Sequence, residues 1–391
     1  FKQKTAYEIS LGLVGSEMCI RDRKNGMKIS QIRLYCVDLP IKGAGYQLSR
    51  GRLVTQTANV VVEITTDTGV TGWGESCPFG LNYLGGFGGG SLATLKELCP
   101  LLIGRNPLEI DAINWFMDAT LAGHIYAKSA IDIACWDILG KATGLPLYTL
   151  LGGMTNKAPL VRTSVNAAEG DLAAGIEAKR RQGFQVLTLK VGDDPVADAE
   201  LTLAVAAQAK PGDRISADAN GGWLLHEAMT YIHRIQDAPG VMIEQPCETV
   251  SDCVELGKRT NHPIVLDESI DDLGVLSSIL TLKQASAVNL KIERIGGITK
   301  TRQMRDLCLK AGCAMFVQEV GGAEITYAAT THLAHTIPEH LLLGATTIKV
   351  DKSLASGAPV MDRGRVRCND GPGLGLEINA DMLGDPRAMY K

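Results

Sequence analysis

The sequence predicts an α/β fold in which a (β/α) barrel follows a smaller α+β region. Short apolar runs recur along the middle of the chain, and each ends at or beside a charged residue. Helical patterns fill the gaps, as expected when parallel strands alternate with helices. In such a barrel the strand ends share one mouth, so the charged residues should converge there. They are Lys190, Asp218, Glu244, Asp267, Lys291 and Glu319, at intervals of 23 to 28 residues.

The first half of the chain is expected to form an α+β capping domain over residues 27–150. A strand pattern begins at Met27, so residues 1–26 are interpreted as a non-native or disordered extension. Two β-rich runs flank Asp67–Gly69, which predicts an antiparallel hairpin. The glycine-rich stretch 85–90 lacks the Gly-Lys-Ser/Thr sequel of a phosphate loop, so it is expected to be a mobile loop over a site or a linker.

The barrel is expected over residues 151–349. Helical patterns at 195–210, 225–236 and 300–311 separate its strands, and 341–347 would supply the last one. The Gly- and Pro-rich residues from about 350 to 391 are expected to pack back on the capping domain.

Composition excludes several classes of function. A chain of 391 residues suits two domains. The net charge of −4 gives no support to nucleic-acid binding, and no apolar run is long enough to span a membrane. The ten cysteines include no Cys-x-x-Cys pair, which disfavours zinc and disulfides and suits a reducing cytoplasm. We expect a cytoplasmic homo-oligomer that binds a small carboxylate.

Three of the strand-end residues, Asp218, Glu244 and Asp267, are carboxylates on successive predicted strands. Held together they would repel strongly unless a cation lies between them. Oxygen ligands favour Mg²⁺, with Mn²⁺ second. The alternative is that each acid is a separate salt-bridge partner or helix N-cap.

Lys190 and Lys291 lie on the strands either side of that trio, which places them across the mouth from each other. One amine on each face of a substrate suits removal of a proton α to a carboxylate. The base must be neutral, and we expect the cation, the second lysine and burial to lower its pKa. Two surface lysines are the alternative, a weaker one for Lys291 because it follows an apolar run.

Five short motifs occur in a specific order: Thr188–Lys190, Ala217–Asn220, Ile243–Pro246, Leu266–Ser269 and Leu290–Gly297. With them the chain resembles the enolase superfamily, in its mandelate racemase/muconate lactonizing branch. The resemblance implies a (β/α)7β modified TIM barrel under an N-terminal α+β capping domain. It implies Asp218, Glu244 and Asp267 as Mg²⁺ ligands and the two lysines as the acid/base pair. Asn220 and Glu268 would support them, Glu268 by orienting Lys291.

Two departures from the family pattern bear on the chemistry. Members often carry Lys-x-Lys on the second strand, whereas this chain has Thr188 at the first position. The seventh strand ends in Gln318-Glu319 without the histidine of the mandelate-racemase-like branch, which favours two-lysine chemistry.

A narrower resemblance involves Asp38–Pro40, Gly72–Pro78, Gly123–Lys128 and Glu244–Cys247. These stretches are similar to proline-betaine and hydroxyproline-betaine 2-epimerases and to cis-3-hydroxyproline dehydratases. The betaine enzymes have Asp-Ala-Trp-Gly-Gly after the seventh strand, where this chain has Glu319–Gly322. The missing Trp removes a cation–π partner for a quaternary ammonium, but Glu319 could pair with a substrate cation.

Four further residues are candidates for substrate contact. Tyr46 and Arg50 lie in a loop that the family uses over the substrate. His124 and Tyr126 could reach the mouth from the capping domain, although a structural role for His124 is equally open.

We therefore expect a Mg²⁺-dependent isomerase that epimerises a small proline-like amino acid or betaine through a metal-stabilised enediolate. The alternative is a dehydratase that expels water from the same intermediate, for example from cis-3-hydroxyproline. A remote alternative is a non-catalytic ligand-binding barrel.

Overall fold

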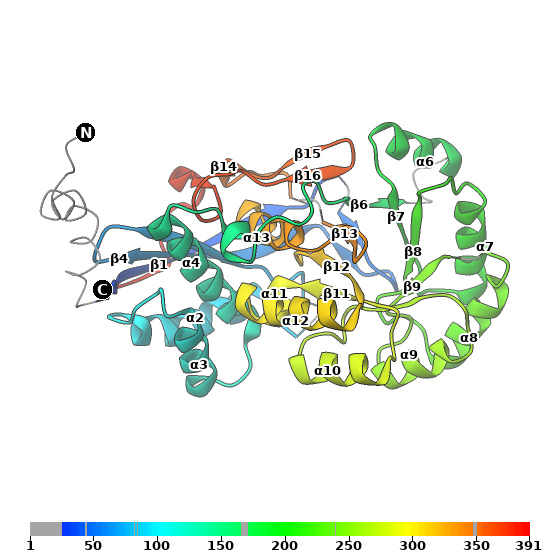
Figure 1. The fold of residues 1–391 in the computed structure, drawn as a ribbon, viewed down its shortest axis with the longest axis horizontal. Coiled ribbons are helices and arrows are strands. Elements are labelled where there is room, and N and C mark those ends of the chain that lie inside the picture. Colours follow the sequence, from blue (N-terminus) through cyan, green and yellow to red (C-terminus); the bar gives the residue numbers. More distant parts are fainter. Residues whose placement is uncertain are drawn as a thin grey trace, which may run out of the picture.

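The structure is a computed structural model with an antiparallel sheet and its helices at one end and a barrel at the other (Figure 1). It describes residues 26–43, 45–81, 83, 85–165, 171–238, 240–346 and 350–391. The extension expected at residues 1–26 therefore lies outside the described residues, apart from Gly26. Within these ranges no helix is long and apolar enough to cross a membrane.

The capping sheet has the strand order β18-β1-β4-β5 and is antiparallel throughout. Its strands are β1 (Ile29–Pro40), β4 (Gln56–Thr66), β5 (Thr71–Ser76) and β18 (Ala388–Tyr390). The predicted hairpin joins β4 to β5, with Glu63 opposite Trp73. The last strand pairs with the first, Tyr390 opposite Ile32, so the end of the chain returns to the capping sheet.

Helices of the capping part pack on or beside this sheet. They are α2 (Gly88–Leu102), α3 (Ile110–Thr120), α4 (Ile125–Thr143) and α5 (Leu147–Leu150). The helix α4 lies directly on β5 because Gly72 and Gly74 have no side chains: a Cβ atom on Gly74 would lie 1.7 Å from the carbonyl oxygen of Ala130.

Eight parallel strands form the barrel, in the order in which they occur in the chain. They are β6 (Arg162–Val165), β7 (Val186–Lys190), β8 (Arg214–Asp218), β9 (Met242–Glu244), β10 (Ile264–Leu266), β11 (Ala287–Lys291), β12 (Ala314–Gln318) and β13 (Leu342–Ala345). A parallel bridge between Val161 and Ala345 closes the ring. Among the described residues β13 is followed by no α-helix, so the (β/α)7β prediction is confirmed.

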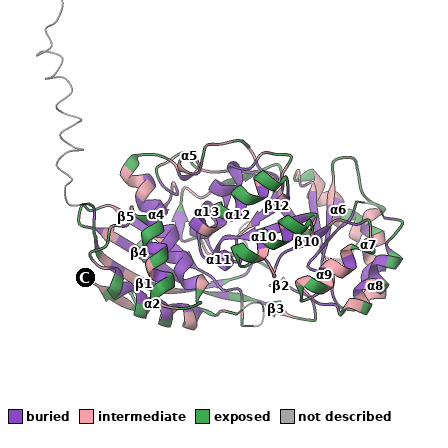
Figure 2. Ribbon diagram, turned by 60° about the horizontal axis from the view of Figure 1, so that its bottom comes forward, coloured by how far each residue is buried: buried purple, intermediate pink, exposed green. Residues whose placement is uncertain are grey.

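The helices of the repeat surround the strands and present their buried faces to them (Figure 2). They are α6 (Leu172–Arg181), α7 (Pro195–Ala206), α8 (Leu225–Arg234), α9 (Val250–Gly257), α10 (Leu273–Leu282), α11 (Ile292–Ile295), α12 (Ile298–Ala311) and α13 (Glu324–His335). All of α13 is buried, so His332 and His335 are interior residues.

Short elements complete the chain. They are β2 (Tyr46–Gln47), β3 (Leu53–Val54), β14 (Ala355–Ser356), β15 (Val360–Asp362), β16 (Arg365–Arg367), β17 (Glu377–Ile378) and a 3-10 turn (Ala380–Met382). The hairpin of β2 and β3 brings Tyr46 from the capping part to the barrel mouth.

Buried carboxylates join the two parts. Glu75 in β5 accepts hydrogen bonds from the backbone N–H groups of Ala323 and Thr326 at the start of α13. Asp132 in α4 accepts the backbone N–H of Thr299 at 3.0 Å, at the start of α12. Negative charge at a helix N-terminus is stabilising, so both contacts fix the capping part over the barrel.

Candidate active site

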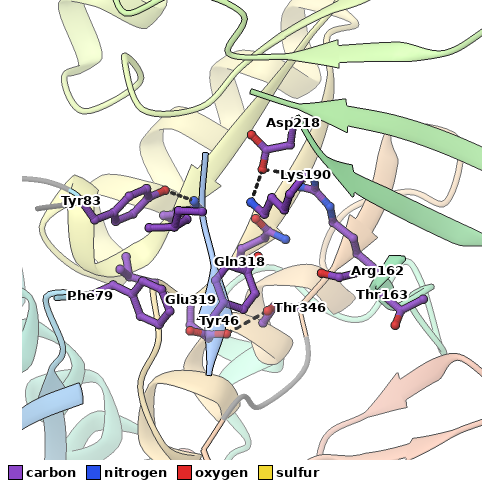
Figure 3. Close-up of a pocket in the computed structure, with 14 residues that line it drawn as sticks. Tyr46, Phe79, Tyr83, Arg162, Thr163, Lys190, Asp218, Gln318, Glu319 and Thr346 are labelled. Atoms are coloured by element: carbon purple, nitrogen blue, oxygen red, sulfur yellow. Dashed lines mark hydrogen bonds and ion pairs between the residues drawn. The ribbon is translucent and has the colours of Figure 1, made fainter. Parts of the chain in front are cut away.

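A small cavity of about 110 Å³ opens at the carboxyl ends of the barrel strands, under the capping part (Figure 3). Five of the predicted site residues line it: Tyr46, Lys190, Asp218, Lys291 and Glu319. In an eight-stranded ring β7 and β11 are four positions apart, so the two lysines come from opposite walls. The cavity therefore suits a small molecule held between two amines.

The ammonium of Lys190 lies 2.6 Å from Asp218 Oδ2 and donates a second hydrogen bond to Asn220 Oδ1 at 3.1 Å. Burial is the largest single influence on the pKa of Lys190 and would lower it, but the charges of Asp218 and Tyr46 and the hydrogen bond to Asp218 together outweigh burial, so the pKa is raised. This is the opposite of the expected direction, because the sequence does not reveal so close an ion pair.

Lys291 stands in a different set of contacts. Its ammonium donates to Asp267 Oδ2 at 2.7 Å and to the hydroxyl oxygen of Tyr83 at 2.6 Å. The other oxygen of Asp267 receives Arg294 Nη1 at 2.8 Å. Burial would raise the pKa of Asp267, but the two cations outweigh burial and lower it.

Glu244 is fully buried and has a donor at every acceptor position. Oε1 accepts Arg162 Nη1 at 3.1 Å and Asn289 Nδ2 at 3.0 Å, while Oε2 accepts Arg162 Nη2 and Ser216 Oγ. A carboxylate has about four such positions. Burial raises the pKa of Glu244, and the guanidinium of Arg162 opposes that effect.

The donor chemistry of the three carboxylates fits a hard divalent cation, since all three are buried and offer oxygen only. As placed, each is instead paired with a lysine or arginine of the chain. Among the residues that the structure describes, no group of three or more His, Cys, Asp or Glu is placed to hold a metal ion. None of the three acids caps a helix. The N-caps of α6, α7 and α10 are Asp171, Asp194 and Asp272. The metal-ligand set stays a prediction.

Asn220 links Lys190 to Glu268, and no hydrogen bond joins Glu268 to Lys291 among the described residues. Asn220 Nδ2 donates to Glu268 Oε1 at 2.9 Å, and its own Oδ1 receives Lys190. Asn220 adopts a left-handed backbone conformation, with φ of 45°. Burial, followed by the charge of Asp267, raises the pKa of Glu268 to about 7.

Three aromatic side chains from the capping part cover the cavity. Phe79 makes edge contacts with Tyr46 at 5.4 Å and Tyr83 at 6.0 Å between ring centroids. The ring centroid of Tyr46 lies 5.2 Å from Lys190 Nζ, and that of Tyr83 lies 5.2 Å from Lys291 Nζ. Glu319, buried, accepts the hydroxyl of Thr346 at 2.9 Å in the same cavity.

Seven predicted site residues do not line this cavity: the acids and supporting residues Glu244, Asp267, Asn220 and Glu268, and the substrate contacts Arg50, His124 and Tyr126. Arg50 is exposed, and its backbone N–H binds Asp193. His124 and Tyr126 line a separate pocket next to the glycine-rich stretch that ends in α2. His124 has the left-handed backbone of the residue before α4.

Sequence reasoning missed Arg162, Phe79 and Tyr83. Arg162 had a signal, since a lone arginine in an apolar barrel strand must find a buried acid. Phe79 and Tyr83 had none, because a loop residue carries no sign of the side chain that it will meet.

A parallel barrel with buried acids and two lysines at its strand ends, beneath an α+β cap, defines a class of barrel enzymes whose active site is the mouth. The chain belongs to the mandelate racemase/muconate lactonizing enzyme family. Residues 31–152 match that family's N-terminal domain, and residues 171–382 match the enolase C-terminal domain-like family.

Three relatives give the degree of similarity. The chain is 42% identical over 369 residues to a cis-3-hydroxy-L-proline dehydratase of Roseibium aggregatum, covering 93% of this chain and 100% of the relative. It is 30% identical to an N-succinyl-L-Arg/Lys racemase of Bacillus cereus, over 91% of this chain and 97% of the relative. A crystal structure from Roseovarius nubinhibens, complexed with magnesium, superposes with a TM-score of 0.88 at 35% identity, covering 93% of this chain and 100% of that one. The prediction of an enzyme is confirmed.

Proposed function

We propose that this enzyme removes the proton α to the carboxylate of cis-3-hydroxyproline, or a close analogue, and expels the β-hydroxyl as water. The observation that carries removal of the α-proton is the pair of lysines on opposite walls of one small cavity. The 42% identity to a cis-3-hydroxy-L-proline dehydratase over nearly the whole chain supports the choice of substrate.

The stereochemistry of the cis isomer suits opposed groups. Its hydroxyl lies on the same face of the ring as the carboxylate, so the α-proton lies on the other face. Loss of water then requires a base on one face and an acid on the other. Lys190 on β7 would take the proton. An acid on the opposite wall, where Lys291 ends β11, would protonate the departing hydroxyl.

Other side chains of the cavity would orient the ring. Glu319 is an acceptor for the substrate's ring ammonium. The aromatic cover of Tyr46, Phe79 and Tyr83 would lie against the ring's apolar carbons and exclude water, which strengthens the charge interactions inside.

Mg²⁺ is part of the proposal, with Asp218, Glu244 and Asp267 as the residues that would hold it. When bound it would supply positive charge next to the substrate carboxylate while the α-proton leaves. Glu244 can take part only if one of its four donors is displaced, and Arg162 supplies two of them. A chelator should then stop turnover, and full activity in its presence would contradict this part.

A second candidate is epimerisation at the same carbon, with Lys190 removing the proton and Lys291 returning one to the opposite face. The opposed lysines favour it as directly as they favour water loss. The two outcomes differ in whether the substrate carries a β-hydroxyl that can leave.

Proton NMR in D₂O tests the proposal with cis- and trans-3-hydroxy-L-proline and L-proline. We expect the cis isomer to lose its hydroxyl and the trans isomer to keep its hydroxyl. L-proline should exchange its α-proton without other change. Inversion of cis-3-hydroxyproline with the hydroxyl retained would favour epimerisation. The absence of any α-exchange or water loss would overturn the proposal.

A further inference from the structure

Among the described residues of the capping part, Tyr83 is the one that forms a hydrogen bond with Lys291 in the cavity. It lies between β5 and α2, 208 residues from Lys291 in sequence. The ammonium is the donor in their 2.6 Å contact, which leaves the phenol hydrogen for another acceptor. Figure 3 shows the Tyr83 hydroxyl directed at this amine, across the cavity from Lys190.

The two lysines therefore differ in their surroundings. Lys190 donates to Asp218 and to the side chain of Asn220. Lys291 donates to Asp267 and to a phenol that is itself a proton donor. A phenol is protonated at neutral pH, so the Tyr83 hydroxyl can act as a donor. Hydroxide is a poor leaving group, and a donor on this wall would meet it.

We propose that Tyr83 is the catalytic acid that protonates the departing β-hydroxyl, an inference that rests on the proposed function. Lys190 takes the α-proton after its ammonium, paired with Asp218, has released a proton to solvent. The electron pair of that C–H bond becomes the new Cα–Cβ double bond. The Cβ–O bond breaks, its electrons leave with the oxygen, and the Tyr83 proton completes a water molecule. The Lys291 ammonium returns a proton to the phenolate through their existing hydrogen bond.

Tyr83→Phe separates the two halves of this reaction. We expect water loss from cis-3-hydroxy-L-proline to fall about 10²- to 10⁴-fold, the range for a general acid. Exchange of the α-proton of L-proline should fall far less than water loss because Lys190 remains, and it also reports that the variant is folded. Tyr148→Phe is the matched control, since its hydroxyl binds Asp370 away from the cavity and both rates should match wild type.

A substrate that needs no acid gives the second measurement. Fluoride leaves as an ion, so cis-3-fluoro-L-proline should lose fluoride at similar rates in wild type and Tyr83→Phe. If Tyr83→Phe slows the release of water and the release of fluoride by the same factor, or slows α-exchange as much as water loss, Tyr83 only positions Lys291. Unchanged loss of water in the variant would also overturn the role, whereas wild type that never loses water would instead remove the proposed function.

Discussion

Glu293 is a fully buried carboxyl in α11, directly after β11. Both of its oxygens accept the backbone N–H of Val320 at 3.1 Å. Burial, with the charge of nearby Glu319, raises its pKa to about 8. The group therefore holds its proton more tightly in the folded enzyme than in the unfolded chain. Its contribution to stability is complete below the unfolded pKa near 4.5 and is lost as pH rises through about 8.

Glu293→Gln should flatten this pH dependence. Between about pH 5 and 8, one such group lowers the free energy of unfolding by at most about 1.4 kcal/mol per pH unit. Urea titrations at several pH values should therefore show wild type weakening relative to the variant as pH rises. The exposed Glu97→Gln variant should follow wild type. A constant difference between wild type and Glu293→Gln across this range would refute the assignment.

The sequence predicts which charged residues end the barrel strands, but it does not predict which side chains these residues pair with. Lys190, Asp218 and Lys291 reach the mouth because each is the last residue of its strand. The pairing of Glu244 with Arg162 depends on side-chain reach across the barrel, which no spacing reveals.

The contact of β5 with α4 depends on two glycines at alternate positions of the strand. A Cβ atom on Gly74 would lie 1.7 Å from the Ala130 carbonyl oxygen, and one on Gly72 would lie 2.3 Å from that of Ala134. Because the obstacles are backbone atoms, the helix would have to move. The sequence predicts both elements but not this approach, since a Gly-Trp-Gly strand gives no sign of what faces it.

Gly74→Ala should therefore destabilise the enzyme by about 1–3 kcal/mol, the usual cost of an overpacked core. Gly175→Ala is the control, because Gly175 lies in α6 with open space around its Cα and should gain up to about 1 kcal/mol. Urea unfolding of both variants gives the comparison. A Gly74→Ala enzyme as stable as wild type would show that α4 can shift without loss.

For the whole molecule, the regular alternation of strands and helices is enough to predict the barrel. Its closure through Val161 and Ala345 follows from eight strands of similar length. The sequence predicts that the last residues pack on the capping domain, but it does not predict which residues of β18 pair with which residues of β1. The cavity itself is the least predictable feature, because its cover comes from the Tyr46 and Tyr83 loops, which meet the barrel only after folding.

The central claim is that this fold holds Lys190 and Lys291 against opposite faces of one carbon. Deuterium incorporation into L- and D-proline, measured by proton NMR, tests it with single alanine variants. Each enantiomer presents its α-proton to one wall. We predict that Lys190→Ala stops exchange of L-proline and spares D-proline, and that Lys291→Ala does the reverse. A single variant that exchanges both enantiomers at the wild-type rate would contradict the claim.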